Sequence, residues 1–123
     1  YQVLADKGVG AIPFSPLEQG LLTDRYLQGI PADSRAAGAS VFLKSEQITP
    51  ERLEKVRALN DIARQRGQTL AQMALAWLHK SPVTSSVIIG ASRLSQIADC
   101  VKAQEGAPFS EEDLKQIDRI ALG

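Results

Sequence analysis

Residues 87–100 constrain the fold more than any other stretch of this chain. The run Val87-Ile88-Ile89 leads into a glycine, and Ser92 then opens a helical pattern with a repeating apolar face. This order is typical of a buried strand, a tight turn and an amphipathic helix. Arg93 and Gln96 lie beside the first helical turn, whose backbone N–H groups point outward. The stretch therefore predicts an anion site, most naturally for a phosphate, although most such units only build a sheet.

Length, charge and cysteine usage exclude several classes of protein. The 123 residues suffice for one domain with a core, and 14 basic residues balance 14 acidic ones. We therefore expect no nucleic-acid partner and no membrane partner. No apolar run approaches the roughly 18 residues of a membrane span, and the single cysteine, Cys100, fits a reducing compartment. These features predict a cytoplasmic protein, and a chain that opens on Tyr1 is expected to be a fragment of something longer.

The order of the other elements indicates an α/β protein. A helix end at 1–7 precedes a short strand at 9–14, and a long loop then reaches residue 47. Helices are predicted over 50–66, 70–80 and 93–104 and after Ser110, from capping residues, apolar periodicity and glycine stops. The apolar run between the second and third of these helices predicts a strand over 84–90. The residues expected to face inward are Leu53, Val56, Leu59, Ile62, Ala63, Leu70, Met73, Ala74, Trp77, Leu78, Leu94, Ile97, Ala98, Val101, Leu114, Ile117 and Ile120. Two parallel strands cannot cover their own edges and faces, so we expect the chain to be part of a larger sheet.

Four ordered motifs span most of the chain. They are FSPLEQGLLTDRY at 14–26, Gly29-Ile30-Pro31 with Ser34-Arg35, LAQMALAW at 70–77, and Gly90-Ala91-Ser92 with Gln96. Together they resemble the aldo-keto reductase family, most strongly the branch with potassium channel β subunits and bacterial glyceraldehyde-3-phosphate reductases. The resemblance implies a (β/α)₈ TIM barrel. Residues 1–123 would be one helix-rich segment, the C-terminal half, with the last two strands and their helices.

The resemblance implies that the first motif and the long loop bind one end of NADP. Phe14 stands where the family stacks an aromatic ring on the nicotinamide, although a core phenylalanine at a strand end is equally natural without the family. The residues expected to follow the pyrophosphate or hold phosphate oxygens are Ser15, Pro16, Leu17, Gln19, Arg25 and Arg35. For an isolated loop arginine, solvation is the simpler explanation, and only its place in the motif favours a phosphate.

The resemblance assigns the adenosine end of the cofactor to residues 90–100. The residues expected to grip the 2′-phosphate and ribose are Gly90, Ser92, Arg93 and Gln96. A 2′-phosphate needs donors and positive charge, so these residues favour NADP over NAD. Asp99 takes the place of a glutamate that relatives use towards the adenine amino group. Cys100 departs from the pattern, since relatives usually have asparagine there and a thiol is a weak donor and acceptor.

The catalytic residues of the family come from early strands that have no counterpart in this chain. The family transfers a hydride from NADPH to an aldehyde or ketone, with tyrosine as general acid. Tyr1, Tyr26 and His79 stand in no motif that matches the family's catalytic residues, so we expect no catalytic residue and no metal site. The chain is expected to be part of an NADPH-dependent oxidoreductase for a small carbonyl substrate, and inactive alone. The open alternatives are a non-catalytic nucleotide-binding module and a half-barrel that self-associates as a homo-oligomer.

Overall fold

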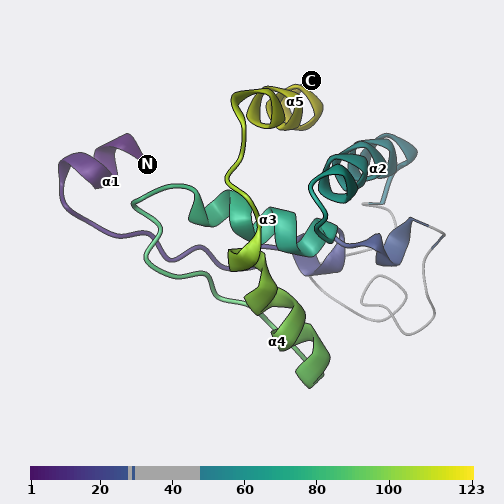
Figure 1. Ribbon diagram of the computed structural model, residues 1–123, viewed down its shortest axis with the longest axis horizontal. Coiled ribbons are helices and arrows are strands. Elements are labelled where there is room, and N and C mark those ends of the chain that lie inside the picture. The colour runs from purple at the N-terminus through teal and green to yellow at the C-terminus, as the bar shows by residue number, and fades with distance from the viewer. Residues whose placement is uncertain (28, 30–47) are drawn as a thin grey trace.

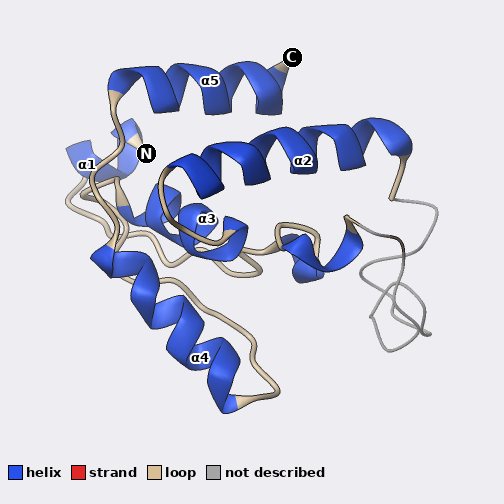
Figure 2. Ribbon diagram, turned by 45° about the vertical axis from the view of Figure 1, so that its right-hand side comes forward, coloured by secondary structure: helices blue, strands red, loops and turns tan. Residues whose placement is uncertain are grey.

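A computed structural model describes residues 1–27, 29 and 48–123, and this part of the chain is mainly helical (Figure 1). The elements, with η marking 3₁₀ turns, are α1 (Gln2–Asp6), η1 (Glu18–Gly20), η2 (Asp24–Tyr26), α2 (Pro50–Gln65), α3 (Leu70–His79), α4 (Leu94–Val101), η4 (Lys102–Glu105) and α5 (Glu111–Leu122). Central helix α3 packs against α2, α4 and η4, and α5 packs along α2 (Figure 2). Within the described ranges, no helix is both long and apolar enough to cross a membrane.

The three helices of the core begin at side chains that cap their first turns. Thr49 accepts a hydrogen bond from the first turn of α2. The pairs Thr69–Gln72 and Ser110–Asp113 form reciprocal capping boxes at the starts of α3 and α5. Each cap satisfies amide groups that have no partner inside the helix, and so fixes where the helix begins. The starts of these three helices are therefore as the sequence predicts.

The two segments predicted as strands lie side by side and run parallel. Isolated bridges join Ala11 to Thr84 and Phe14 to Ile88. The Ile88 amide donates to the Pro13 carbonyl at 2.9 Å. Pro13 has no N–H group to extend the ladder, and among the described residues neither segment pairs with a third one. The parallel pairing is as predicted, whereas isolated bridges replace the two regular strands that the sequence predicts.

The apolar core lies between α2, α3 and α5. All the predicted inward residues of these helices are buried or half-buried. Two residues from the segment that follows Phe14 also belong to this core. Leu21 is 2% exposed and Tyr26 is 1% exposed. The buried members of this cluster are Leu21, Tyr26, Val56, Ile62, Ala63, Leu70, Met73 and Ile117. Helical periodicity thus predicts the core faces of α2, α3 and α5 correctly.

Helix α4 is the exception, and it extends away from the other helices (Figure 2). Its side chains Leu94, Ile97 and Val101 are 81%, 45% and 60% exposed. The helix meets α3 through its other side, where Asp99 and Cys100 are half-buried. The prediction that this helix buries Leu94, Ile97, Ala98 and Val101 is therefore wrong for this structure. Its apolar pattern predicts a helix correctly, but no described element covers that face.

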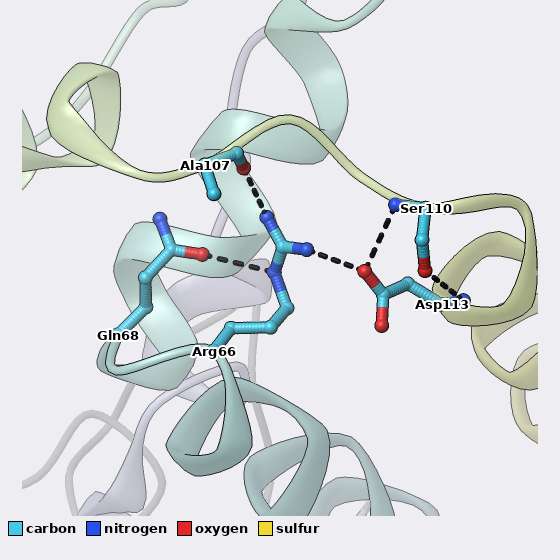
Figure 3. Close-up of polar contacts among 5 residues, drawn as sticks. All are labelled: Arg66, Gln68, Ala107, Ser110 and Asp113. Carbon is cyan, nitrogen blue, oxygen red and sulfur yellow. Dashed lines mark hydrogen bonds and ion pairs between the residues drawn. The ribbon is translucent and has the colours of Figure 1, made fainter.

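Arg66 joins the end of α2 to the segment that leads into α5 (Figure 3). Its guanidinium donates to Gln68 Oε1 at 3.2 Å, to the Ala107 carbonyl at 2.6 Å and to Asp113 Oδ2 at 2.6 Å. The guanidinium carbon also lies 3.9 Å from the centre of the Phe109 ring. The Arg66 side chain itself is only 8% exposed, whereas that of Asp113 is 27% exposed. Arg66 therefore fixes the position of α5 against α2.

The pKa of Asp113 is lower than usual, chiefly because the Ser110 backbone N–H donates to its carboxylate, with a smaller contribution from Arg66. A lowered folded-state pKa stabilises the fold above the unfolded value of about 3.9, and this contribution is lost as pH falls through the folded pKa. We expect Asp113→Asn to be less stable than wild type in urea at pH 7, with the difference shrinking below about pH 4. Asp118→Asn, on the exposed side of α5, is the control. A difference that stays constant with pH would contradict this account.

Candidate functional site

Two loops leave the same end of the paired segments. The Phe14–Ile88 bridge is the last pairing along both segments. Residues 15–20 follow the first segment, and residues 89–93 follow the second. Because the segments run parallel, both loops start at one edge, the position at which α/β proteins commonly place their ligand sites. The structure therefore brings the starts of the two predicted cofactor-binding motifs together.

The first loop has an unusual backbone and presents an aromatic ring. Phe14 is 77% exposed at its start. Ser15, Glu18 and Gln19 have φ angles of 52°, 47° and 59°, a left-handed conformation that residues other than glycine rarely adopt. Local hydrogen bonds hold it, since Gln19 Nε2 donates to Ser15 Oγ at 3.1 Å and the Glu18 amide donates to the Ser15 carbonyl at 3.0 Å. Such strain gathers at binding sites, which makes this loop a candidate binding element.

Contacts with the helical core anchor this loop. Glu18 forms an ion pair with Arg52 on α2, a contact across 34 positions that no local sequence pattern indicates. Just after the loop, the Thr23 hydroxyl donates to the Gly20 carbonyl at 2.7 Å. Of the two arginines expected to hold phosphate oxygens, Arg25 lies in η2 and Arg35 lies outside the described residues. Both remain predictions.

The second loop is shaped by Gln96. Its Oε1 accepts from the Ser92 amide at 2.8 Å and from the Arg93 amide at 3.1 Å, so this side chain closes the turn at the start of α4. The predicted ligand-gripping residues Gly90, Ser92, Arg93 and Gln96 are all exposed. Arg93 forms no ion pair with any other described residue. An exposed guanidinium beside a helix N-terminus is suited to an anion such as phosphate.

Asp99 and Cys100 lie on the side of α4 that faces α3. The Asp99 carboxylate accepts from Gln72 Nε2 at 2.6 Å and from Thr69 Oγ1 at 3.3 Å. Burial raises the pKa of the Cys100 thiol, and the neighbouring Asp99 charge raises it further, so the thiol stays protonated at neutral pH. The sequence indicates the Thr69–Gln72 capping box, but the contact with Asp99 spans 27 positions and carries no local signal.

The remaining residues with catalytic potential lie in ordinary structural surroundings. Tyr26 packs in the core at 1% exposure. His79 is exposed at the last position of α3, and Tyr1 is exposed at the start of the chain. In the part of the chain that the structure describes, no cluster of His, Cys, Asp and Glu could hold a metal ion.

Comparison with known protein families matches residues 1–122 to the aldo/keto reductase family. The chain belongs to this family. It is 49% identical over 119 residues to L-glyceraldehyde 3-phosphate reductase of Escherichia coli K12, covering 94% of the chain and 34% of that relative. It is 44% identical over 117 residues to a Schizosaccharomyces pombe protein named as a voltage-gated potassium channel β subunit, covering 92% of the chain and 34% of that relative. The predicted family and branch are thus confirmed, and this aldo-keto reductase chain spans about a third of the length of these curated relatives.

Proposed function

We propose that the chain supplies the NADP-binding loops of an NADPH-dependent aldo-keto reductase. The observation that carries the proposal is the parallel Phe14–Ile88 bridge, which starts both loops at one edge. In this proposal residues 1–123 form the C-terminal part of a (β/α)₈ barrel, with the two bridged segments as its last strands. The complete protein reduces a small aldehyde or ketone in the cytoplasm. L-glyceraldehyde 3-phosphate is the first substrate to test, because an Escherichia coli relative bears that name.

The residue types of the two loops fit NADP. Arg93 and Ser92 are exposed at the N-terminus of α4, where a 2′-phosphate would find positive charge and donors. Phe14 offers an exposed flat face for the nicotinamide ring, and the strained loop after it would follow the pyrophosphate. Asp99 would accept from the adenine amino group. When bound, NADPH supplies the hydride, and the residues of this chain bind and orient it.

Calorimetric titration of the chain with NADPH and with NADH tests the proposal. We expect NADPH to bind at least about tenfold more tightly, because the 2′-phosphate gains charge-assisted hydrogen bonds that NADH cannot form. The fluorescence of Trp77, the only tryptophan, gives an independent readout of the same titration. Equal affinity for the two cofactors would contradict the assignment of the 2′-phosphate site, and binding of neither would contradict the whole proposal.

A chimera tests the link to carbonyl reduction. The matched 119 residues of the Escherichia coli reductase would be replaced by the corresponding part of this chain, so that the relative supplies the rest of the barrel. We expect the chimera to oxidise NADPH in the presence of L-glyceraldehyde 3-phosphate. The relative truncated before the matched region is the negative control. A folded chimera that binds NADPH without reducing the aldehyde would limit the proposal to nucleotide binding.

A further inference from the structure

The carboxylate of Asp99 is held by two side chains at the start of α3. Gln72 Nε2 donates to Oδ1 at 2.6 Å, and Thr69 Oγ1 donates to Oδ2 at 3.3 Å. Each carboxylate oxygen therefore has one partner on the neighbouring helix, which restricts both the side-chain torsion and the plane of the carboxylate. The N-terminal end of α3 carries partial positive charge, which favours a carboxylate at this place.

Gln72 is itself fixed. Its side-chain oxygen accepts from the Thr69 amide at 3.0 Å, and the residue is only 8% exposed. One end of its amide thus closes the capping box of α3, and the other end holds Asp99. An amide used at both ends has little freedom to rotate, so the position of Asp99 is tied to the first turn of α3.

We propose that Gln72, supported by Thr69, is a positioning residue that orients Asp99 to recognise the adenine amino group of the cofactor. This inference rests on the proposed NADP-binding function, which already assigns the adenine amino group to Asp99, and adds the residues that position this carboxylate. A carboxylate offers about four lone-pair sites, and the contacts with α3 occupy two of them. The rest can accept from an adenine amino group, whereas a base with a carbonyl oxygen at that position would meet the carboxylate with repulsion.

Nicotinamide hypoxanthine dinucleotide phosphate is the probe that separates base recognition from the other contacts. This analogue of NADPH carries a carbonyl oxygen in place of the adenine amino group and keeps the 2′-phosphate. We expect the wild-type chain to prefer NADPH over the reduced analogue by roughly tenfold or more. In Gln72→Leu, which removes the donor to Asp99, we expect this preference to fall to about threefold or less, while the preference for NADPH over NADH is kept.

Three further variants distinguish a specific effect on Asp99 from a general loss of structure. Gln72→Glu keeps an acceptor for the capping box and replaces the donor that faces Asp99 with a carboxylate, so it should also lose the base preference. Gln116→Leu removes a similar amide-to-carboxylate contact, 3.0 Å to Glu112 within α5, and should leave the preference unchanged. In an Asp99→Ala background, Gln72→Leu should have no additional effect on the base preference, because Gln72 acts through Asp99.

The outcomes separate this inference from the function on which it rests. A base preference that is lost in both Gln72 variants and kept in Gln116→Leu supports the positioning role. If the Gln72 variants weaken NADPH and its hypoxanthine analogue by the same factor, Gln72 only ties α3 to α4 and the inference is overturned. A wild-type chain that binds both nucleotides equally overturns it as well. If the wild-type chain binds neither NADPH nor NADH, the proposed function itself fails.

Discussion

Replacing Arg66 with alanine is expected to lower the free energy of unfolding by about 2–4 kcal/mol. The substitution removes three hydrogen bonds from a side chain that is only 8% exposed, to Gln68, Ala107 and Asp113. It also removes the contact of the guanidinium with the Phe109 ring. The Ala107 carbonyl and the Asp113 carboxylate lose a strong donor, and α5 loses its main polar connection to the end of α2.

Urea unfolding followed by circular dichroism and Trp77 fluorescence measures this effect. Lys115→Ala is the matched control, because Lys115 pairs with Glu111 at 3.7 Å through side chains that are 66% and 93% exposed. Such a pair contributes less than about 0.5 kcal/mol. Arg66→Lys should lie in between, since it keeps the charge but cannot reproduce the planar set of donors. An Arg66→Ala variant as stable as the Lys115→Ala control would disprove the role that we assign to Arg66.

Replacing Arg93 with alanine is expected to weaken NADPH binding by about 10–100-fold and to leave NADH binding nearly unchanged. In the proposed site the Arg93 guanidinium faces the 2′-phosphate, which NADH lacks. The exposed position of Arg93 at the N-cap of α4 means that the variant loses charge without leaving a cavity. Salt should reduce the wild-type preference for NADPH, because an exposed ion pair is screened.

Arg119→Ala is the control for this prediction, since Arg119 is an exposed arginine in the last turn of α5. It changes the net charge by the same amount, so any general electrostatic effect on a phosphorylated ligand will appear in both variants. Parallel titrations of both variants with NADPH and NADH give four affinities to compare. An equal loss for the two cofactors in Arg93→Ala would show that this side chain does not recognise the 2′-phosphate.

Local signals explain how much of the fold could be predicted from the sequence. Thr49, the Thr69–Gln72 pair and Ser110 mark helix starts through hydrogen bonds that span three residues, so the pattern and the structure coincide there. The parallel pairing of the two apolar segments also follows from their alternation with helices in the sequence. Regular strands do not form, because a strand needs neighbours that the described part of this chain does not supply.

The interactions that the sequence does not indicate are those between distant residues. The amphipathic pattern shows that α4 has an apolar face, but it does not show which element covers that face. In this structure Leu94 and Val101, on that face, are exposed. In the same way, Asp99 has the residue type of a ligand-binding acid, and only the fold places it against Gln72. The individual site residues remain predictions, whereas the common edge of the two loops is observed.

The loop after Phe14 has a consequence for the energetics of ligand binding. It is held by the bridge to Ile88 at its start, while Leu21 and Tyr26 bury their side chains in the core beyond it. Ordering a flexible backbone costs about 1–2 kcal/mol of conformational entropy per residue. For this segment that cost is met when the helices assemble, before any ligand arrives. A nucleotide that enters would therefore find a shaped surface, and most of its contact free energy would be available as affinity.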